Sequence, residues 1–199
     1  MILTASQSQA LSELLALLLC GEQSAVLAFA HHAHCRSWEA RAREDFTRIE
    51  ADEVRHAEWI QHLQVRLPPT ASDPHLSRQL KQFFARLGSP RLGVHLGRIA
   101  ALDSAVCLIL GSLRRTSLRG APVSHLFESI HHDEARHVAI ARSYARELCP
   151  ASDLLECATE TREQLIGILT LRAPALDTLG VCPDRLFKRL RSLPRGLFQ

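Results

Sequence analysis

The chain has 199 residues, which is enough for one domain with a large buried core. Hydrophobic residues make up 46% of it, charged residues 23% and aromatic residues only 5%, with Leu and Ala dominant, so the composition favours helices over sheets. A formal net charge of +3 is too small to indicate a nucleic-acid partner.

Six cysteines stand far apart and form no Cys-x-x-Cys pair, so we expect no zinc or rubredoxin-type iron site built from thiolates. The apolar run at 14–20 is too short to span a membrane, and no basic residue precedes it as in a signal peptide. We therefore expect a cytoplasmic protein with free thiols and no membrane partner.

The first predicted helix covers 8–34. Its apolar face repeats at helical spacing and consists of Leu11, Leu15, Leu18, Ala25, Val26 and Phe29. Glu22 lies in the middle of this face, where a carboxylate is costly unless a partner or a metal ion neutralises it. His31, His32 and His34 lie near the end of this helix, where the helix dipole and solvent exposure explain them.

The second predicted helix follows a turn near 36–37, with Ser37 as its N-cap, and runs to about 67, where Pro68 and Pro69 stop it. Its predicted inner face consists of Phe46, Ile49, Glu53, His56, Ile60 and Leu63. A crossover with a short helix at 74–87 comes next, because Asp73 is a good N-cap and Pro74 suits the first helical position.

The third predicted helix begins at Ser89 and Pro90 and runs to about 118, with Asp103 in the middle of its apolar stripe, as Glu22 is in the first helix. The fourth helix opens at Pro122 or Ser124 and closes before 150. Its predicted inner face consists of Phe127, Ile130, Glu134, His137, Val138 and Ala141.

The last fifty residues predict two additional helices. Ser152 and Asp153 cap a fifth helix that ends near 171, and a loop leads to a short amphipathic helix at 183–191. The basic residues of this end are Arg185, Lys188, Arg189, Arg191 and Arg195. We interpret it as a packed surface helix with a solvated face; the alternative is a contact with lipid or nucleic acid.

The pattern Asp-Glu-x-Arg-His occurs twice, at 52–56 and at 133–137, 81 residues apart. In each copy the Glu and the His are three residues apart and share one helix face. Glu22 precedes Glu53 by 31 residues, and Asp103 precedes Glu134 by the same 31. Two antiparallel hairpins with turns near the midpoints would bring all these residues to one level. A lone Glu-x-x-His is a common surface coincidence, but the matched offsets favour a site.

The chemistry of this set predicts a two-metal centre. Its predicted ligands are Glu22, Glu53, His56, Asp103, Glu134 and His137. Four carboxylates and two imidazoles suit two divalent first-row ions with bridging carboxylates. Iron is the first choice, with manganese or a mixed iron and manganese site as the second, whereas the carboxylate count and the lack of Cys ligands argue against zinc.

These motifs resemble those of the ferritin-like superfamily, and the Asp-Glu-x-Arg-His form is similar to that of bacterial di-iron oxygenases and of the ribonucleotide reductase small subunit. The resemblance covers about 20–149. It implies an all-α fold of one domain: a ferritin-like four-helix bundle over 8–149 with a short crossover helix, followed by one or two C-terminal helices in 150–199.

The resemblance also implies a set of residues behind the ligands. Asp133 would accept a hydrogen bond from His56, and Asp52 one from His137, across the two halves. Arg55 and Arg136 would hold these acids in place, although all four can also be read as solvated helix charges.

Some positions depart from known members. Ile60 stands where a radical-forming reductase subunit needs Tyr, and the Cys-rich module of rubrerythrin is absent. Asp103 stands where storage ferritin usually keeps Glu. Arylamine N-oxygenases carry an added His one turn before the second motif; His131 lies three residues before Glu134 rather than the usual four, so it is a candidate additional ligand or a structural His. Glu50 holds the matching place in the first half.

We therefore expect a di-iron oxygenase or oxidase that uses O2 and an external electron donor to hydroxylate, N-oxygenate or desaturate a small organic molecule. The expected pocket lining is Ala25, Val26, Phe29, Val106, Cys107 or Phe127. A homodimer is compatible with this reading. The alternatives are a ferroxidase or peroxide-scavenging protein similar to ferritin or rubrerythrin, and a nucleic-acid modifier similar to the di-iron tRNA hydroxylase, which rests only on the basic tail.

Overall fold

The computed structural model describes residues 3–116, 118–193 and 197–198. This part of the chain is all helical, as the composition predicts, and has no strand. Its helices are α1 (Ala5–His34), α2 (Ala40–Gln64), α3 (Pro74–Leu87), α4 (Leu92–Leu113), α5 (Pro122–Leu148), α6 (Ala151–Thr170), α7 (Ala173–Thr178) and α8 (Pro183–Arg191).

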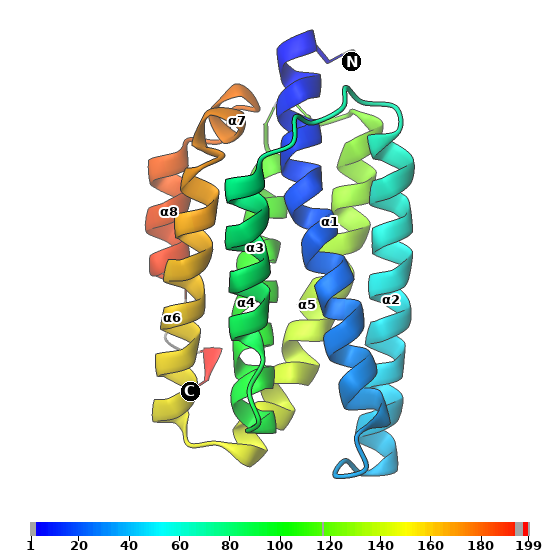
Figure 1. The fold of residues 1–199 in the computed structure, drawn as a ribbon, viewed down its shortest axis with the longest axis vertical. Coiled ribbons are helices and arrows are strands. Elements are labelled where there is room, and N and C mark those ends of the chain that lie inside the picture. The colour runs from blue at the N-terminus through cyan, green and yellow to red at the C-terminus, as the bar shows by residue number, and fades with distance from the viewer. Residues whose placement is uncertain (1–2, 117, 194–196, 199) are drawn as a thin grey trace.

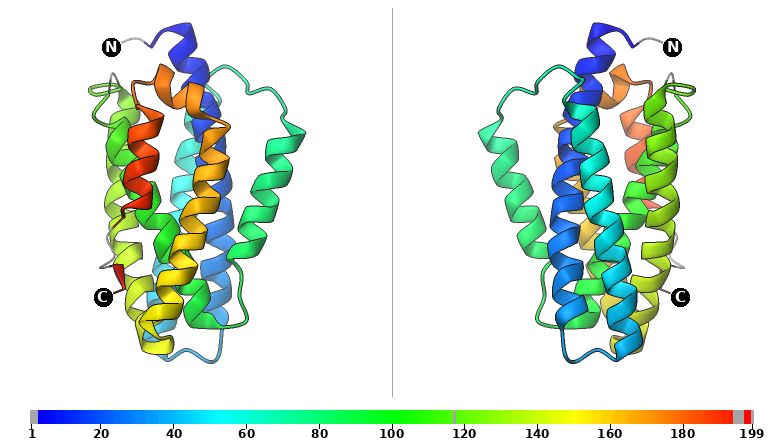
Figure 2. Two further views of the ribbon diagram at one scale, coloured as in Figure 1. Left: turned by 90° about the vertical axis from the view of Figure 1, so that its left-hand side faces the viewer. Right: turned by 90° about the vertical axis from the view of Figure 1, so that its right-hand side faces the viewer.

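The long helices form two antiparallel hairpins that lie side by side (Figure 1). α1 and α2 make the first hairpin, α4 and α5 the second, and α2 contacts α5. α3 is the crossover between the hairpins and lies at one side of the molecule (Figure 2), where its buried residues pack against Ile168 of α6. α6 packs along α4, and α7 and α8 pack near the end of the bundle that holds the N-terminus (Figure 1).

Two helix starts agree with the sequence signals. The Asp73 carboxylate accepts a hydrogen bond from the backbone N–H of Leu76 at 3.0 Å, with Pro74 in the first turn, so α3 has the predicted cap and bounds. α5 begins at Pro122 rather than at Ser124. α1 begins three residues before its predicted start, because Thr4 forms a capping box.

Other predicted caps are wrong. Ser37 does not cap α2, because the backbone N–H of Trp38 bonds to Cys35 and the turn continues to Glu39. The Ser89 hydroxyl accepts a hydrogen bond from the backbone N–H of Arg91, which bends the chain before α4 begins, three residues after the predicted start.

The remaining differences concern the ends of the predicted helices. α6 starts after Pro150 without a side-chain cap, so the cap predicted at Ser152 and Asp153 is wrong; the Asp153 carboxylate instead pairs with Arg91 at 2.6 Å. α2 ends at Gln64 and α4 at Leu113, both earlier than predicted. The predicted loop after α6 contains α7.

Of the three apolar clusters among the described residues, the two larger ones lie on either side of one polar level, and the third joins α3 to α6. One includes Leu15 of α1, Ile60 of α2 and Phe127 of α5, and the other includes Phe29 of α1 and Ile49 of α2. The acidic residues of the predicted site lie between these clusters along their helices. Burial of the apolar residues therefore fixes the level at which the polar side chains meet.

The chain carries two helices, among the described residues, that are long and apolar enough to cross a membrane by length and composition alone, α1 and α4. This is weak evidence, since core helices of soluble proteins pass the same test. All six cysteines are free thiols, as expected.

The basic face of α8 is partly engaged within the chain. Arg191 pairs with Glu163 at 3.2 Å, and Arg189 donates a hydrogen bond to the Ser112 hydroxyl. Arg195, the last basic residue of the predicted patch, lies outside the described residues.

Candidate metal centre

Each predicted ligand comes from the helix on which the sequence places it. Glu22 lies on α1 and Asp103 on α4, while the Glu-x-x-His pairs lie on α2 and α5. All six side chains are buried, with at most 5% of each residue exposed, and they are Glu22, Glu53, His56, Asp103, Glu134 and His137. So many ionisable groups leave water only when they neutralise one another or share a cation.

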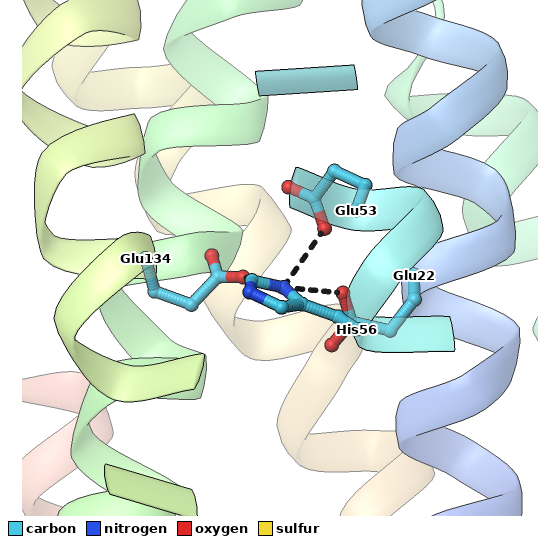
Figure 3. A group of neighbouring side chains, drawn as sticks. All are labelled: Glu22, Glu53, His56 and Glu134. Carbon is cyan, nitrogen blue, oxygen red and sulfur yellow. Dashed lines mark hydrogen bonds and ion pairs between the residues drawn. The ribbon is translucent and has the colours of Figure 1, made fainter. Parts of the chain in front are cut away.

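The closest group consists of Glu22, Glu53, His56 and Glu134, each of which offers one ligand atom within 4.8 Å of the others (Figure 3). The Nδ1 atom of His56 lies 3.3 Å from the Glu22 carboxylate and 3.7 Å from those of Glu53 and Glu134. This buried cluster of carboxylates and an imidazole is compatible with a metal site.

The other two predicted ligands lie next to this group. The Nδ1 atom of His137 is 3.0 Å from Oε1 of Glu53 and 3.8 Å from the Glu134 carboxylate. Burial, together with the nearby charges of Glu53 and Glu22, raises the pKa of Asp103, and this residue lines the same cavity. The two halves of the chain therefore contribute equivalent residues to one centre.

Both imidazoles are held from behind by an aspartate of the opposite half. The Nε2–H of His56 donates to Asp133 at 3.1 Å, and that of His137 donates to Asp52 at 3.2 Å. This is the cross-pairing that the sequence resemblance implies. Because Nε2 of each ring is held by an aspartate, Nδ1 is directed toward the carboxylates, which is the orientation that a metal-binding imidazole needs.

Two arginines complete this outer layer. Arg55 and Arg136 each donate to both Asp52 and Asp133. Burial acts to raise the pKa of each aspartate, but hydrogen bonds from the arginines and imidazoles lower it below its ordinary value. Both aspartates are therefore anionic and keep their acceptor role.

The centre holds protons when only side chains occupy it. Burial acts to lower the pKa of His56, but the nearby carboxylates of Glu22 and Glu53 raise it to about 10. Burial and neighbouring carboxylates raise the pKa of Glu22, Asp103 and Glu134 well above their ordinary range. These groups carry protons where a metal ion would supply the positive charge.

Buried polar atoms without hydrogen-bond partners give an independent test of whether this cluster suits metal ions. Buried Oε1 of Glu53, Oδ2 of Asp103 and Nδ1 of His137 have no hydrogen-bond partner among the described residues. Nδ1 of His137 and Oε1 of Glu53 lie 3.0 Å apart, yet their geometry does not form a hydrogen bond. Native interiors rarely leave such atoms unpaired. Two carboxylate oxygens and one imidazole nitrogen without hydrogen-bond partners are atoms that can coordinate divalent cations.

A cavity of about 150 Å³ opens on one side of the centre. Glu22, Glu53, Asp103 and Glu134 form its polar wall, and the rest is almost entirely apolar and comes from α1, α3, α4, α5 and α6. α3 contributes Leu80, Phe83, Phe84 and Leu87 and so covers the outer side. An apolar cavity of this kind excludes water from the centre.

Some predicted site residues lie elsewhere. The ring of His131 lies beside Gly111, eight residues beyond Asp103, which corresponds to about 12 Å along α4, so it does not reach the centre. Glu50 is half-buried on α2 and makes no hydrogen bond or ion pair within the described residues; it is not among the four clustered ligand candidates.

The expected pocket lining is half right. Ala25, Val106 and Phe127 line the cavity, whereas Val26, Phe29 and Cys107 do not. Phe29 packs against the ring of Phe46 instead, and its ring also lies 6.3 Å from that of the ligand candidate His137.

The sequence did not predict a contact between buried His32 and half-buried His95. His32 is fully buried rather than exposed, and its Nε2 lies 3.1 Å from Nδ1 of His95, which lines the cavity. The available signal was spacing, because His32 lies three residues after Phe29 and so continues the buried stripe of α1.

Comparisons of the chain with models of protein families, with curated proteins and with solved structures gave no match. The assignment of this site therefore rests on the chain's own residues.

Proposed function

We propose that this chain is a ferritin-like, non-haem di-iron oxygenase or oxidase that oxidises an organic molecule at a carboxylate-bridged two-metal centre. The observation that carries the proposal is the buried cluster of Glu22, Glu53, His56 and Glu134 directly beside an apolar cavity. Two redox-active ions, when bound, would supply the O2 chemistry that none of these side chains can perform.

The chain's own residues supply geometry and a dry environment. Asp52 and Asp133 fix the tautomer and orientation of the two imidazoles, so that both Nδ1 atoms face the carboxylates. The apolar walls keep water away from the reacting carbon. Glu22 and Asp103 line the cavity and therefore lie on the side from which a substrate would approach.

The overall reactions balance with O2 and an external two-electron donor. In hydroxylation a C–H bond becomes C–OH, and the second oxygen atom leaves as water with two electrons and two protons. In desaturation two hydrogen atoms leave the substrate, and O2 with the same electrons and protons becomes two waters. Both reactions therefore need a separate reductant that supplies two electrons in each turnover.

The cavity favours an organic substrate over the alternative of iron oxidation alone. A ferroxidase needs a polar route for iron ions, whereas the walls that reach this centre through the cavity are apolar. The discriminating measurement is turnover of excess ferrous iron. A protein that oxidises many irons per chain and accumulates a mineral would be a metal-handling protein instead.

The test is O2 uptake by the anaerobically prepared, ferrous-loaded protein, with metal analysis of the same samples. We expect two irons per chain and O2 uptake that candidate substrates accelerate. Glu53→Gln should lose iron and O2 uptake. Glu50→Gln is the matched control, since Glu50 lies one turn earlier on α2 and is not a member of the cluster, and this variant should behave like the unmodified chain. Retention of both irons by Glu53→Gln would refute the assigned ligands.

A further inference from the structure

A second, larger cavity lies beside the one at the metal centre. Its volume is about 720 Å³, and it is lined by residues of α1, by the start of α3 with the segment 70–73 before it, and by Arg172. We call it the outer cavity, and the cavity of about 150 Å³ at the centre the inner cavity. Exposed residues of the segment 70–72 and of α3 belong to the outer lining, so this cavity is open to solvent.

The two cavities differ in polarity. The lining of the outer cavity includes two acidic and two basic side chains, which are those of Glu13, Asp73, Lys81 and Arg172. The guanidinium of Arg172 lies 3.4 Å from the Asp73 carboxylate and 3.9 Å from that of Glu13. Charged groups retain water, whereas the apolar walls of the inner cavity exclude it. A molecule that passes from the outer to the inner cavity therefore has to give up its hydration shell.

Two leucines form the wall between the cavities. Among the described residues, Leu17 of α1 and Leu80 of α3 are the ones that line both cavities. α3, which carries Leu80, lies at one side of the molecule (Figure 2). Leu17 and Leu80 are half-buried, whereas Leu76 and Leu87, toward the two ends of α3, are buried. The side chain of Leu80 therefore has room to move that those of Leu76 and Leu87 lack.

The next turn of each helix continues toward the metal centre. Gly21 follows Leu17 by four residues on α1 and so shares its helix face, and Phe84 follows in the same way on α3. Gly21 and Phe84 line the inner cavity, and a Cβ added at Gly21 would lie 4.0 Å from the Phe84 ring. Glu22 of the centre follows Gly21 directly. Because Gly21 has no side chain, it leaves space on the side of the wall that faces the centre.

We propose that Leu17 and Leu80 form a gate between the two cavities, and that the size of these two side chains decides which neutral molecules pass from solvent to the metal centre. The gate opens when the side chains rotate into the space beside Gly21. Ions stay in the outer cavity, because the apolar walls behind the gate cannot replace their hydration. This inference rests on the proposed function for the use of the route, but not for its existence.

The first experiment measures entry into the metal-free protein by NMR exchange, with benzene as the probe, because a dry apolar cavity of about 150 Å³ accommodates benzene. Leu80→Ala and Leu17→Ala should each raise the rates of entry and exit together by about tenfold, since a gate lowers a barrier that both directions share. Leu80→Phe should lower both rates. Leu76→Ala is the matched control, since Leu76 lies one turn earlier on α3 and lines the outer cavity alone, and it should keep the rates of the unmodified chain. No binding of benzene, unchanged rates in both gate variants, or equal acceleration by Leu76→Ala would overturn the proposal.

The second experiment blocks the outer cavity and leaves the gate unchanged. Cys20 lines the outer cavity as a free thiol, and burial raises its pKa, so it is modified with a bulky maleimide in mildly alkaline solution. The modified protein should take up benzene more slowly. Cys20→Ser, treated in the same way and still modified at its exposed Cys182, should keep the original rate. Unchanged entry after modification of Cys20, verified by mass spectrometry, or failure of Cys20 to react at all, would contradict entry through this cavity.

The two experiments separate the gate from the proposed function, because neither needs metal ions or O2. Benzene entry that depends on Leu17 and Leu80, in a protein that takes up no O2 when loaded with ferrous iron, would support the gate and refute the oxygenase. Substrate-accelerated O2 uptake by a protein whose benzene entry is indifferent to both leucines would refute the gate alone.

Discussion

Binding of metal ions to the metal-free centre should release protons. Four ligand candidates of the metal-free centre have a raised pKa: His56, at about 10, and the carboxyl groups of Glu22, Asp103 and Glu134. Metal ligands must lose these protons, so two ions should displace between about two and four of them. Each released proton makes the apparent affinity rise about tenfold per pH unit, or about 1.4 kcal/mol.

The assay is calorimetric titration with Mn2+, which resists oxidation, in two buffers of different ionisation enthalpy. The difference between the observed enthalpies gives the number of protons released. His56→Gln should release about one proton fewer, whereas Glu50→Gln should match the unmodified protein. Binding of two ions with no net proton release would show that the cluster is already deprotonated and that our account of its electrostatics is incorrect.

Three other predictions follow from positions outside the ligand set. Asp133→Asn should weaken metal affinity about tenfold to a hundredfold, measured by competition with a chromophoric chelator, because His56 loses its anionic partner; unchanged affinity would contradict that role. The pKa values of His32 and His95 are lowered to about 3 and about 4 in the folded chain. Below pH 6.5 these residues therefore bind protons in the unfolded chain, whereas in the folded chain they bind protons only near pH 3 to 4. Each of these two groups should therefore lower the free energy of unfolding by roughly 2 kcal/mol between pH 7 and pH 5. In urea titrations, the free energy of unfolding of His32→Leu should depend less steeply on pH. Gly93→Ala should destabilise the fold by about 1–3 kcal/mol, since the added Cβ would lie 2.8 Å from the Cβ of Leu148 on α5. Gly167→Ala, whose added Cβ would meet no atom within 4 Å, should stabilise the fold by about 1 kcal/mol. Thermal unfolding of the two variants distinguishes the two signs.

Helix periodicity made much of the site predictable. A Glu and a His three residues apart share a face in any α-helix, so the orientation of Glu53 and His56 depended on local geometry alone. The equal offsets from Glu22 and Asp103 then located the level at which the hairpins align. The structure brings these residues together because the apolar stripes around them must also be buried.

Helix ends were less predictable, because several caps compete within a few residues. Ser37 and Ser89 have the right chemistry for N-caps, yet both lie in turns before their helices. The turn after α1 is decided by burial of Trp38 against Phe46, a contact between residues eight apart that local propensity does not contain.

The sequence by itself determined the helical class and the types and register of the clustered carboxylates and imidazoles, because these depend on composition and on a repeat of 3.6 residues. Only the tertiary structure decided that His131 faces away from the centre while His32 and His95 join inside the bundle. The cavity likewise exists only because α3 and α6 close over α1 and α4 at a particular distance. Such distances depend on side chains that pack between helices far apart in the chain, and no local pattern encodes them.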